Sequence, residues 1–228
     1  MTIFDLLLIL VFLGSLLAIL ALGYFSLRQQ WSRARRVLTG LLSVLVIYTV
    51  ILLTVSLLSP QRVFAMHQKR CFDDWCISVE QVVQQSSVGV APQTARAQGT
   101  FYLVTVQVSS QARGISQRAL DVQAYLLDAN NRRFDLSPVG QRALDSSGGG
   151  GLPLNSLLAP EGSFTRALVF DVPAGASSLS LAVTHGLFPD VLVIGSEQSF
   201  LHKPTIIQFR GQHSSMLPVH RSKIHHEV

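Results

Sequence analysis

The pattern of apolar and polar positions divides the chain into two parts. Residues Ile3–Leu27 are apolar around the whole circumference of a helix, interrupted only by Asp5 and by small or weakly polar residues. Residues Val37–Leu58 form a second apolar run that contains no charged side chain. Because a helix rises about 1.5 Å per residue, about twenty residues cross a hydrocarbon core of about 30 Å. The pattern therefore predicts a transmembrane hairpin of two helices within residues 1–59.

A cleaved signal peptide is the alternative interpretation of the first run. Signal peptides begin with basic residues and have a shorter apolar stretch, whereas this N-terminus contains Asp5 and no Lys or Arg, and the run is longer. Cleavage would also leave the second run unexplained. We therefore favour two spans, with Tyr24 and Trp31 at a membrane interface and Tyr48 at a contact between the helices.

The loop at residues 28–36 sets the predicted orientation. It has no acidic residue and carries four arginines, Arg28, Arg33, Arg35 and Arg36. The positive-inside rule places such a loop in the cytoplasm. Arg62, Lys69 and Arg70 follow the second run, but long downstream domains translocate largely regardless of charge. We predict a two-pass protein of the plasma or inner membrane whose domain after residue 59 is extracytoplasmic.

Two small residues in the first run, Gly14 and Ala18, are candidates for helix packing. They are four positions apart, a spacing that lets two helices approach closely. Such pairs are common by chance, so the spacing alone does not identify a partner helix.

Cys71 and Cys76 are the two cysteines of the chain, and four residues lie between them. The spacing differs from the redox motif C-x-x-C, and there is no second cysteine pair to complete a zinc site. In an oxidising compartment the simplest interpretation is a local disulfide. Free thiols, a redox switch, or a metal contact through Asp73 and Asp74 are the alternatives. Pro60 ends the second apolar helix, because proline removes a backbone donor. A polar stalk at residues 60–70 then precedes the cysteines.

After Cys76 the hydrophobic period changes to two, which indicates β-strands. The clearest strand is Thr100–Val108, in which every second residue is apolar on one face. The remaining predicted strands are 77–83, 120–127, 133–136, 164–172, 179–183, 191–194 and 205–209. Turns are predicted at 128–132, 160–162 and 173–175, and a flexible glycine loop at 146–151. The fold class is therefore mainly β, an antiparallel immunoglobulin-like β-sandwich over residues 71–210.

Several segments of this domain resemble a bacterial immunoglobulin-like family that is sometimes called telokin-like. The resemblance covers residues 71–210 and implies a fold but no catalytic residues. Its segments are Gly99–Val108, Ala124–Arg132, Leu158–Gly162 and Leu168–Pro173, while Cys71–Cys76 and Ile194–Pro204 resemble membrane-anchored members. A shared fold does not supply a function.

The search for chemistry finds no catalytic, phosphate-binding or dinucleotide-binding motif, and no cofactor or metal site is expected. His185 and His202 could approach one another, but each is more often an ordinary loop residue. The tail at 211–228 contains His213, His220, His225 and His226, and it has too few apolar residues to fix a metal site, so we expect a solvated, disordered tail.

Composition changes this picture little. The chain has 228 residues, a formal charge of +5 and only 14% charged residues. The basic residues form no helix or cluster outside the arginine loop, so nucleic-acid binding is not expected. The sequence predicts a non-enzymatic, membrane-anchored binding module with the bilayer and a protein as partners. The alternatives are an accessory subunit that assembles through its helices and, more distantly, an extracytoplasmic hydrolase. The oligomeric state is left open.

Overall fold

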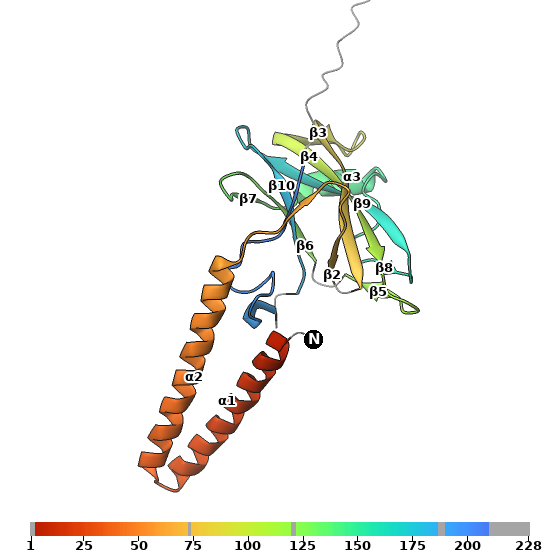
Figure 1. The fold of residues 1–228 in the computed structure, drawn as a ribbon. Coiled ribbons are helices and arrows are strands. Elements are labelled where there is room, and N and C mark those ends of the chain that lie inside the picture. The colour runs from red at the N-terminus through yellow and green to blue at the C-terminus, as the bar shows by residue number, and fades with distance from the viewer. Residues whose placement is uncertain (1–2, 73, 120–121, 187–189, 210–228) are drawn as a thin grey trace, which may run out of the picture.

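The computed structural model describes residues 3–72, 74–119, 122–186 and 190–209. Helices α1 (Ile3–Leu27) and α2 (Trp31–Leu58) form an antiparallel hairpin whose arms diverge toward the β domain (Figure 1). Helix α1 buries none of its described residues, and α2 buries only Ala34, Leu52 and Ser56. The most apolar windows have mean hydropathies of 2.9 and 2.7, so both helices are long and apolar enough to cross a membrane.

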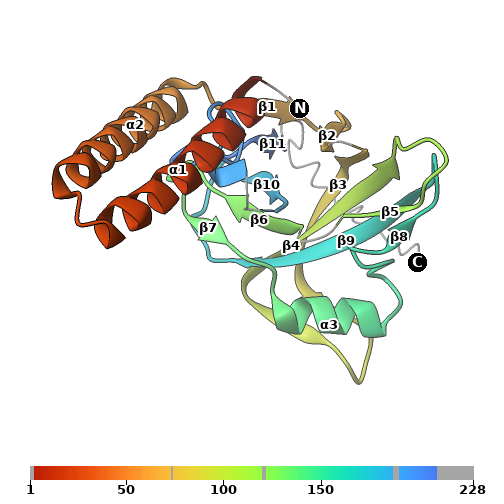
Figure 2. The same ribbon diagram turned by 90° about the horizontal axis from the view of Figure 1, so that it is seen from below.

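The rest of the described chain builds two sheets that pack face to face (Figure 2). One sheet has the order β1-β11-β10-β6-β7 and the other β2-β3-β4-β9; β5 and β8 form a separate short pair. All strand pairs are antiparallel except β1 with β11. The prediction of an antiparallel sandwich behind a helical hairpin is confirmed. The strands are β1 (Val63–Ala65), β2 (Arg70–Phe72), β3 (Trp75–Val88), β4 (Ala95–Ser110), β5 (Gln117–Arg118), β6 (Gln123–Leu127), β7 (Arg133–Phe134), β8 (Leu157–Leu158), β9 (Ser163–Val172), β10 (Ser180–Thr184) and β11 (Ile206–Gln208).

The core lies between the two sheets and is made by alternate residues of each strand. On β4, the side chains of Val104, Val106 and Val108 are completely buried, and Leu126 and Leu181 of the other sheet belong to the same cluster. Successive side chains of a strand point to opposite faces, which is why the period of two in the sequence located these strands. Burying each such side chain stabilises the fold by about 1.5–3 kcal/mol.

Helix α3 (Pro138–Ser146) was not predicted from the sequence. The hydroxyl of Ser137 accepts a hydrogen bond from the backbone N of Gly140 at 3.2 Å, and Pro138 occupies the first helical turn. Both are preferred residues at a helix start. The glycine loop that follows also differs from its prediction as a flexible loop: the carbonyl of Gly150 accepts a hydrogen bond from the backbone N of Ala167 at 2.9 Å.

The outer edge of β9 is covered by α3 (Figure 2). The side-chain amide of Gln141 takes the place of a neighbouring strand there. Its Oε1 accepts from the backbone N of Val169 at 3.0 Å, and its Nε2 donates to the carbonyl of Ala167 at 3.0 Å. An edge covered in this way offers few unpaired backbone groups to another chain.

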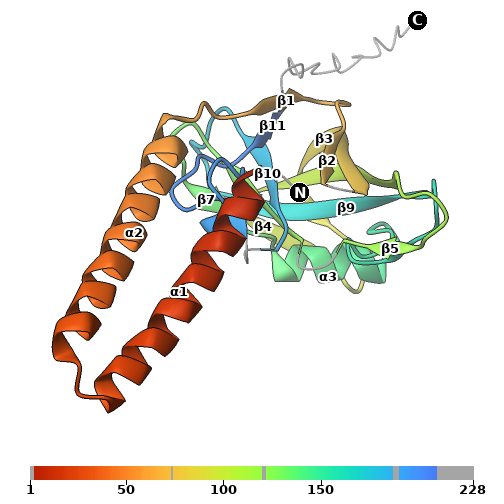
Figure 3. The same cartoon turned by 60° about the horizontal axis from the view of Figure 1, so that its bottom comes forward.

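Two further segments differ from their predictions. Within residues 60–70, predicted as a stalk, Val63–Ala65 pair with β11 and so belong to the sandwich (Figure 3). Residues 191–194, predicted as a strand because all four are apolar, are not a strand. The segment begins with a short 3-10 helix, Asp190–Leu192, and contacts the helical hairpin.

Candidate functional site

Arg70, the first residue of β2, is a buried charged residue with 3% of its surface exposed. Its Nη1 donates to the carbonyl of Val183 at 2.5 Å and more weakly to that of Thr205 at 3.3 Å. Its Nη2 donates to Oε2 of Glu197 at 2.9 Å. The guanidinium thus joins β2 to β10 and to the loop that leads into β11.

Glu197 is the acidic partner at the centre of this cluster. One carboxylate oxygen accepts from Arg62 at 2.6 Å, and the other accepts from Arg70 and from the hydroxyl of Thr205 at 2.7 Å. Burial raises the pKa of Glu197, but the hydrogen bond from Thr205 and the charges of the two arginines outweigh it, so the net pKa is lower than usual. Burial lowers the pKa of Arg70, and the charge of Glu197 opposes that shift. We call Arg62, Arg70, Glu197 and Thr205 the Arg70 cluster.

An aromatic group adjoins the Arg70 cluster. The guanidinium carbon of Arg70 lies 4.4 Å from the ring centre of Phe72. Phe72 stacks on Trp75 with ring centres 4.6 Å apart, and the imidazole of His185 meets both rings edge-on. The polar cluster is therefore shielded from water on one side by aromatic surface.

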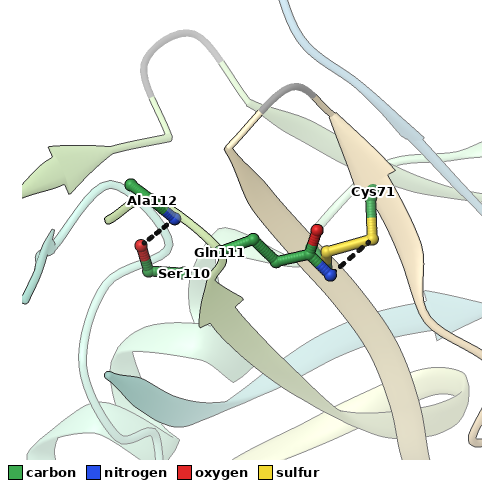
Figure 4. Close-up of a disulfide and its surroundings, with 5 residues drawn as sticks. Cys71, Ser110, Gln111 and Ala112 are labelled. Carbon is green, nitrogen blue, oxygen red and sulfur yellow. Dashed lines mark hydrogen bonds between the residues drawn. A yellow bond between two sulfur atoms is a disulfide. The ribbon is translucent and has the colours of Figure 1, made fainter. Parts of the chain in front are cut away.

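The disulfide between Cys71 and Cys76 lies in the hairpin of β2 and β3 that carries Arg70, Phe72 and Trp75 (Figure 4). The two sulfur atoms are 2.09 Å apart. The side-chain amide of Gln111 approaches the sulfur of Cys71 at 3.5 Å. No cysteine is free. The bridge holds together the two ends of the short turn on which the aromatic stack is built.

The predicted topology residues lie at the far end of the hairpin from the sandwich. The turn between α1 and α2 includes Gln29, with a positive φ of 53°, and Arg28 packs over the ring of Tyr24. The cytoplasmic placement of Arg28, Arg33, Arg35 and Arg36 stays a prediction.

Gly14 and Ala18 line a groove of about 380 Å³ between the helices, together with Gly40 of α2. A Cβ added at Gly14 or at Gly40 would meet nothing within 4 Å. These glycines therefore do not serve close contact between α1 and α2 themselves, and a packing role toward another helix stays a prediction.

Tyr48 has a partner that was not predicted. Its hydroxyl donates to the carbonyl of Leu192 at 2.6 Å, so it contacts the loop between β10 and β11, while its predicted contact with the other helix stays a prediction. The hydroxyls of Ser56 and Ser199 lie 2.5 Å apart, which adds a second contact between α2 and this loop.

Catalytic chemistry has little support in the described part of the chain. No group of three or more His, Cys, Asp or Glu residues there could hold a metal ion. His185 packs against the aromatic stack, while His202 bonds through Nδ1 to the carbonyl of Lys203. Asp74 accepts from Gln117 at 2.5 Å; Asp73 and the histidine-containing tail lie outside the described residues. The side chains of the Arg70 cluster bond to one another and to the backbone of β10 and of the loop before β11, which suits a structural junction.

A shallow hollow of about 380 Å³ lies elsewhere on the sandwich. It is open to solvent and has a mixed polar and apolar lining that includes Gln84, Tyr102, Ser178 and Gln208. The described residues that line the hollow include no acidic or basic side chain, so this part of its surface offers contact without an obvious reacting group.

No known protein-family model matches this sequence, and no curated protein matches it. Among solved structures, the secreted protein MPT63 of Mycobacterium tuberculosis is 11% identical; the match covers 66% of this chain and 98% of that chain, with a TM-score of 0.42. An uncharacterized β-sandwich protein of Clostridium difficile 630 is 9% identical over 66% and 95%, with a TM-score of 0.41. The yjhA protein of Bacillus subtilis is 12% identical over 64% and 98%, with a TM-score of 0.42. Likenesses this distant say nothing about the chemistry of this chain.

The Arg70 cluster was not found from the sequence. Glu197 lies 127 residues after Arg70 and 135 after Arg62, and no local pattern links such positions. One signal was present: Arg70 is followed directly by Cys71 and Phe72, residue types that are unusual on a polar stalk.

Proposed function

We propose that the protein is a two-pass membrane-anchored module whose β-sandwich, on the extracytoplasmic side, binds a protein partner and carries out no catalysis. The observation that best supports this proposal is the exposed apolar surface of the two helices. Helix α1 leaves side chains such as Phe12 and Leu17 each 67% exposed, although the sandwich buries its own apolar residues. Exposed apolar surface on this scale marks contact with lipid or protein.

The arginine loop and the disulfide support the orientation. Four arginines in the turn between the helices favour its retention in the cytoplasm, and a disulfide persists in an oxidising compartment. The resemblance of residues 71–210 to the telokin-like family is part of this proposal. It implies an immunoglobulin-like fold but does not identify a ligand.

The edge of β3 supports a binding role for the sandwich. Strand β2 pairs with β3 only as far as Ile77, and among the described residues no strand pairs with the same edge farther along β3. An open edge can accept an extended segment of a partner through main-chain hydrogen bonds. Gln81 and Gln85 lie exposed on this stretch.

A topology experiment tests the anchor and the orientation. Reporters active only in the cytoplasm or only outside it are fused within residues 28–36 and after Val228, in full-length chains. We expect cytoplasmic activity at the first site and extracytoplasmic activity at the second, with the protein resisting alkaline carbonate extraction. Release by carbonate, or the reverse reporter pattern, would contradict the proposal.

A crosslinking experiment tests the binding role. A photoreactive amino acid replaces Gln85 on the open edge or, as a matched control, Gln123 on β6 of the other sheet, and cells are irradiated. We expect a crosslinked product of defined mass from Gln85 only. Equal products, or none from Gln85, would remove the support that the open edge gives.

The groove between the helices favours a second candidate, an accessory subunit of a membrane complex. Its lining includes Gly14, Ala18 and Gly40, which allow a third helix to approach closely. Replacing Gly14 by Leu should then abolish co-purification of the complex without unfolding the sandwich. If the sandwich released from its helices restores the phenotype of a deletion strain, this candidate is excluded.

A further inference from the structure

The loop between β10 and β11 runs along α2 for more than two helical turns. We call residues 190–201 of this loop the wedge. The carbonyl of Leu192 accepts from Tyr48, and Ser199 bonds to Ser56 near the end of the helix. These positions on α2 are eight residues apart, which corresponds to about 12 Å along the helix axis.

The wedge also borders the start of α1. Phe4 and Asp5 line a small cavity of about 210 Å³ together with Asp190, Ile194 and Ser196 of the wedge. Figures 1 and 3 show this blue segment between the diverging ends of the two helices. The wedge therefore lies between α1 and α2 where they separate.

The depth of the wedge follows from the position of Tyr48. This residue lies ten residues before Leu58, the last residue of α2, so it is about 15 Å from the helix end. A hydrocarbon core is about 30 Å thick, and Tyr48 is also near the middle of the apolar run 37–58. If α2 spans the membrane, its contact with Leu192 draws the wedge below the outer surface of the bilayer.

Part of the backbone of the wedge is paired within the protein, as such a position favours. Irregular chain at membrane depth requires its polar groups to be paired within the protein. The wedge forms consecutive turns, and the hydroxyl of Tyr48 donates a hydrogen bond to the carbonyl of Leu192. The backbone bonds run from N to O as Val193 to Asp190 at 3.1 Å, Ser196 to Val193 at 3.3 Å, Ser199 to Ser196 at 3.1 Å and Phe200 to Val191 at 3.0 Å.

The side chains of the wedge include a buried set and an exposed apolar set, while others, Asp190 and Glu197 among them, are of intermediate exposure. Val193, Ile194 and Ser199 are buried against the protein, whereas Leu192, Phe200 and Leu201 are 40%, 57% and 55% exposed. Leu201 keeps a left-handed backbone with φ of 65°, which costs conformational energy for a residue other than glycine. Directly after it come the polar residues His202 and Lys203, which suit the membrane–water boundary.

We propose that the wedge is a third membrane-embedded element, which inserts between the two spans and contacts the acyl chains of the outer leaflet through Leu192, Phe200 and Leu201. The inference rests on the proposed two-span anchor. It adds a second attachment that two helices alone lack. The sandwich is then also held at the bilayer by residues 190–201, which lie near the C-terminal end of its sequence.

Fluorescence of site-specific labels tests the insertion. Single variants Phe200→Cys and Leu201→Cys of the full chain are labelled with an environment-sensitive NBD dye and reconstituted into phosphatidylcholine–phosphatidylglycerol vesicles. The native cysteines are paired in the disulfide, so an unreacted wild-type chain verifies that only the introduced thiol carries dye. Quenching is measured with aqueous iodide and with lipids that carry nitroxides on their acyl chains.

Two control positions bracket the result. Val46 on α2 is 59% exposed, similar to Phe200 and Leu201, so a label at Val46→Cys reports lipid if α2 spans the membrane. Val90→Cys is 67% exposed in the turn between β3 and β4, away from the helices in Figures 1 and 2, and reports water. We expect positions 200 and 201 to follow Val46, with severalfold weaker iodide quenching than at Val90 and strong quenching by the acyl-chain nitroxides.

The outcomes separate the two proposals. If positions 200 and 201 behave like Val90 while Val46 reports lipid, the wedge proposal is wrong and the anchor stands. If Val46 also behaves like Val90, both are wrong. Leu192→Cys, a third wedge position, guards against a local effect of the dye, and an unfolding midpoint equal to that of the unlabelled chain verifies folding.

Discussion

The helical hairpin and the sandwich treat apolar residues in opposite ways. In the sandwich, Ile77, Phe170 and Leu181 are completely buried, and the hydrophobic effect acts between two sheets of the same chain. In the hairpin, Leu10 and Leu17 are 58% and 67% exposed. The sandwich carries its own apolar environment, whereas the hairpin requires one from outside. Substitutions should therefore have large effects on folding in the first region and small effects in the second.

The largest effect is expected at the Arg70 cluster. Replacing Arg70 by Met leaves the carboxylate of Glu197 partly buried with one cationic partner fewer, and the carbonyl of Val183 without its donor. Breaking a buried pair by removing one partner costs about 3–5 kcal/mol. The free energy of unfolding, measured by urea denaturation of the full chain in detergent, tests this. Arg133→Met is the control, since the side chains of Arg133 and its partner Asp135 are 48% and 67% exposed and such pairs contribute about 0–1 kcal/mol. Equal losses would contradict the assignment.

Reduction of the disulfide should rank second. Opening the short loop between Cys71 and Cys76 releases a chain-entropy constraint of about 2 kcal/mol. Cys71→Ser/Cys76→Ser should lower the free energy of unfolding by this amount and make it insensitive to reductant. An unfolding curve of the wild-type chain that does not change with reductant would show that the bridge contributes nothing.

Two glycines sharpen the comparison at a smaller scale. A Cβ at Gly140 in α3 would lie 2.7 Å from Cγ1 of Val169 and 3.1 Å from Cε1 of Phe101, whereas one at Gly14 meets nothing within 4 Å. Gly140→Ala should destabilise the sandwich by about 1 kcal/mol, near the lower end for overpacking by one methyl group. Gly14→Ala should leave unfolding of the sandwich unchanged. The prediction fails if thermal denaturation gives the reverse ranking.

The smallest effect is a dependence on pH. Because the folded-state pKa of Glu197 lies below its ordinary value of 4.5, its contribution is fully present above that pH. The contribution is lost as the pH falls from 4.5 through the lower folded-state pKa, since the unfolded chain binds the proton more readily. Acid titration of stability should be flatter in Glu197→Gln than in the wild type. Glu80→Gln is the matched variant: hydrogen bonds from Ser78 and then from His67 lower the pKa of Glu80, so it should remove a separate part of the slope.

Sequence reasoning succeeded where one local period decides the structure. The alternation in β4 and the unbroken apolar runs of the hairpin identify their elements without knowledge of the rest. It failed where long-range contacts decide. The apolar run Val191–Ile194 has the composition of a strand, but it forms turns, and the carbonyl of Leu192 accepts a hydrogen bond from Tyr48 of α2. Helix α3 was not predicted, because it begins with a proline and is followed by a run of glycines. Ser137 and Pro138 are nevertheless residues that are preferred at a helix start.

The Arg70 cluster shows the same limit at the level of the site. The cysteine pair is readable because its members are neighbours in the sequence. The salt bridges cannot be read from the sequence, because their partners come from strands and loops that are far apart in the chain. Exposed and buried arginines look alike in a sequence, and only the fold separates Arg70 from Arg133.

The pairing of β1 with β11 bears on how the protein is made. Val63 lies five residues after Leu58, the end of the second helix, and its partner Ile206 is translated about 140 residues later. At synthesis rates of roughly 5–20 residues per second, that interval lasts roughly 7–28 s. During that time the helices have left the ribosome, while the neighbouring strand stays without its partner. The pairing of β1 with β11 therefore cannot form until the residues of β11 have been synthesised, long after those of β1.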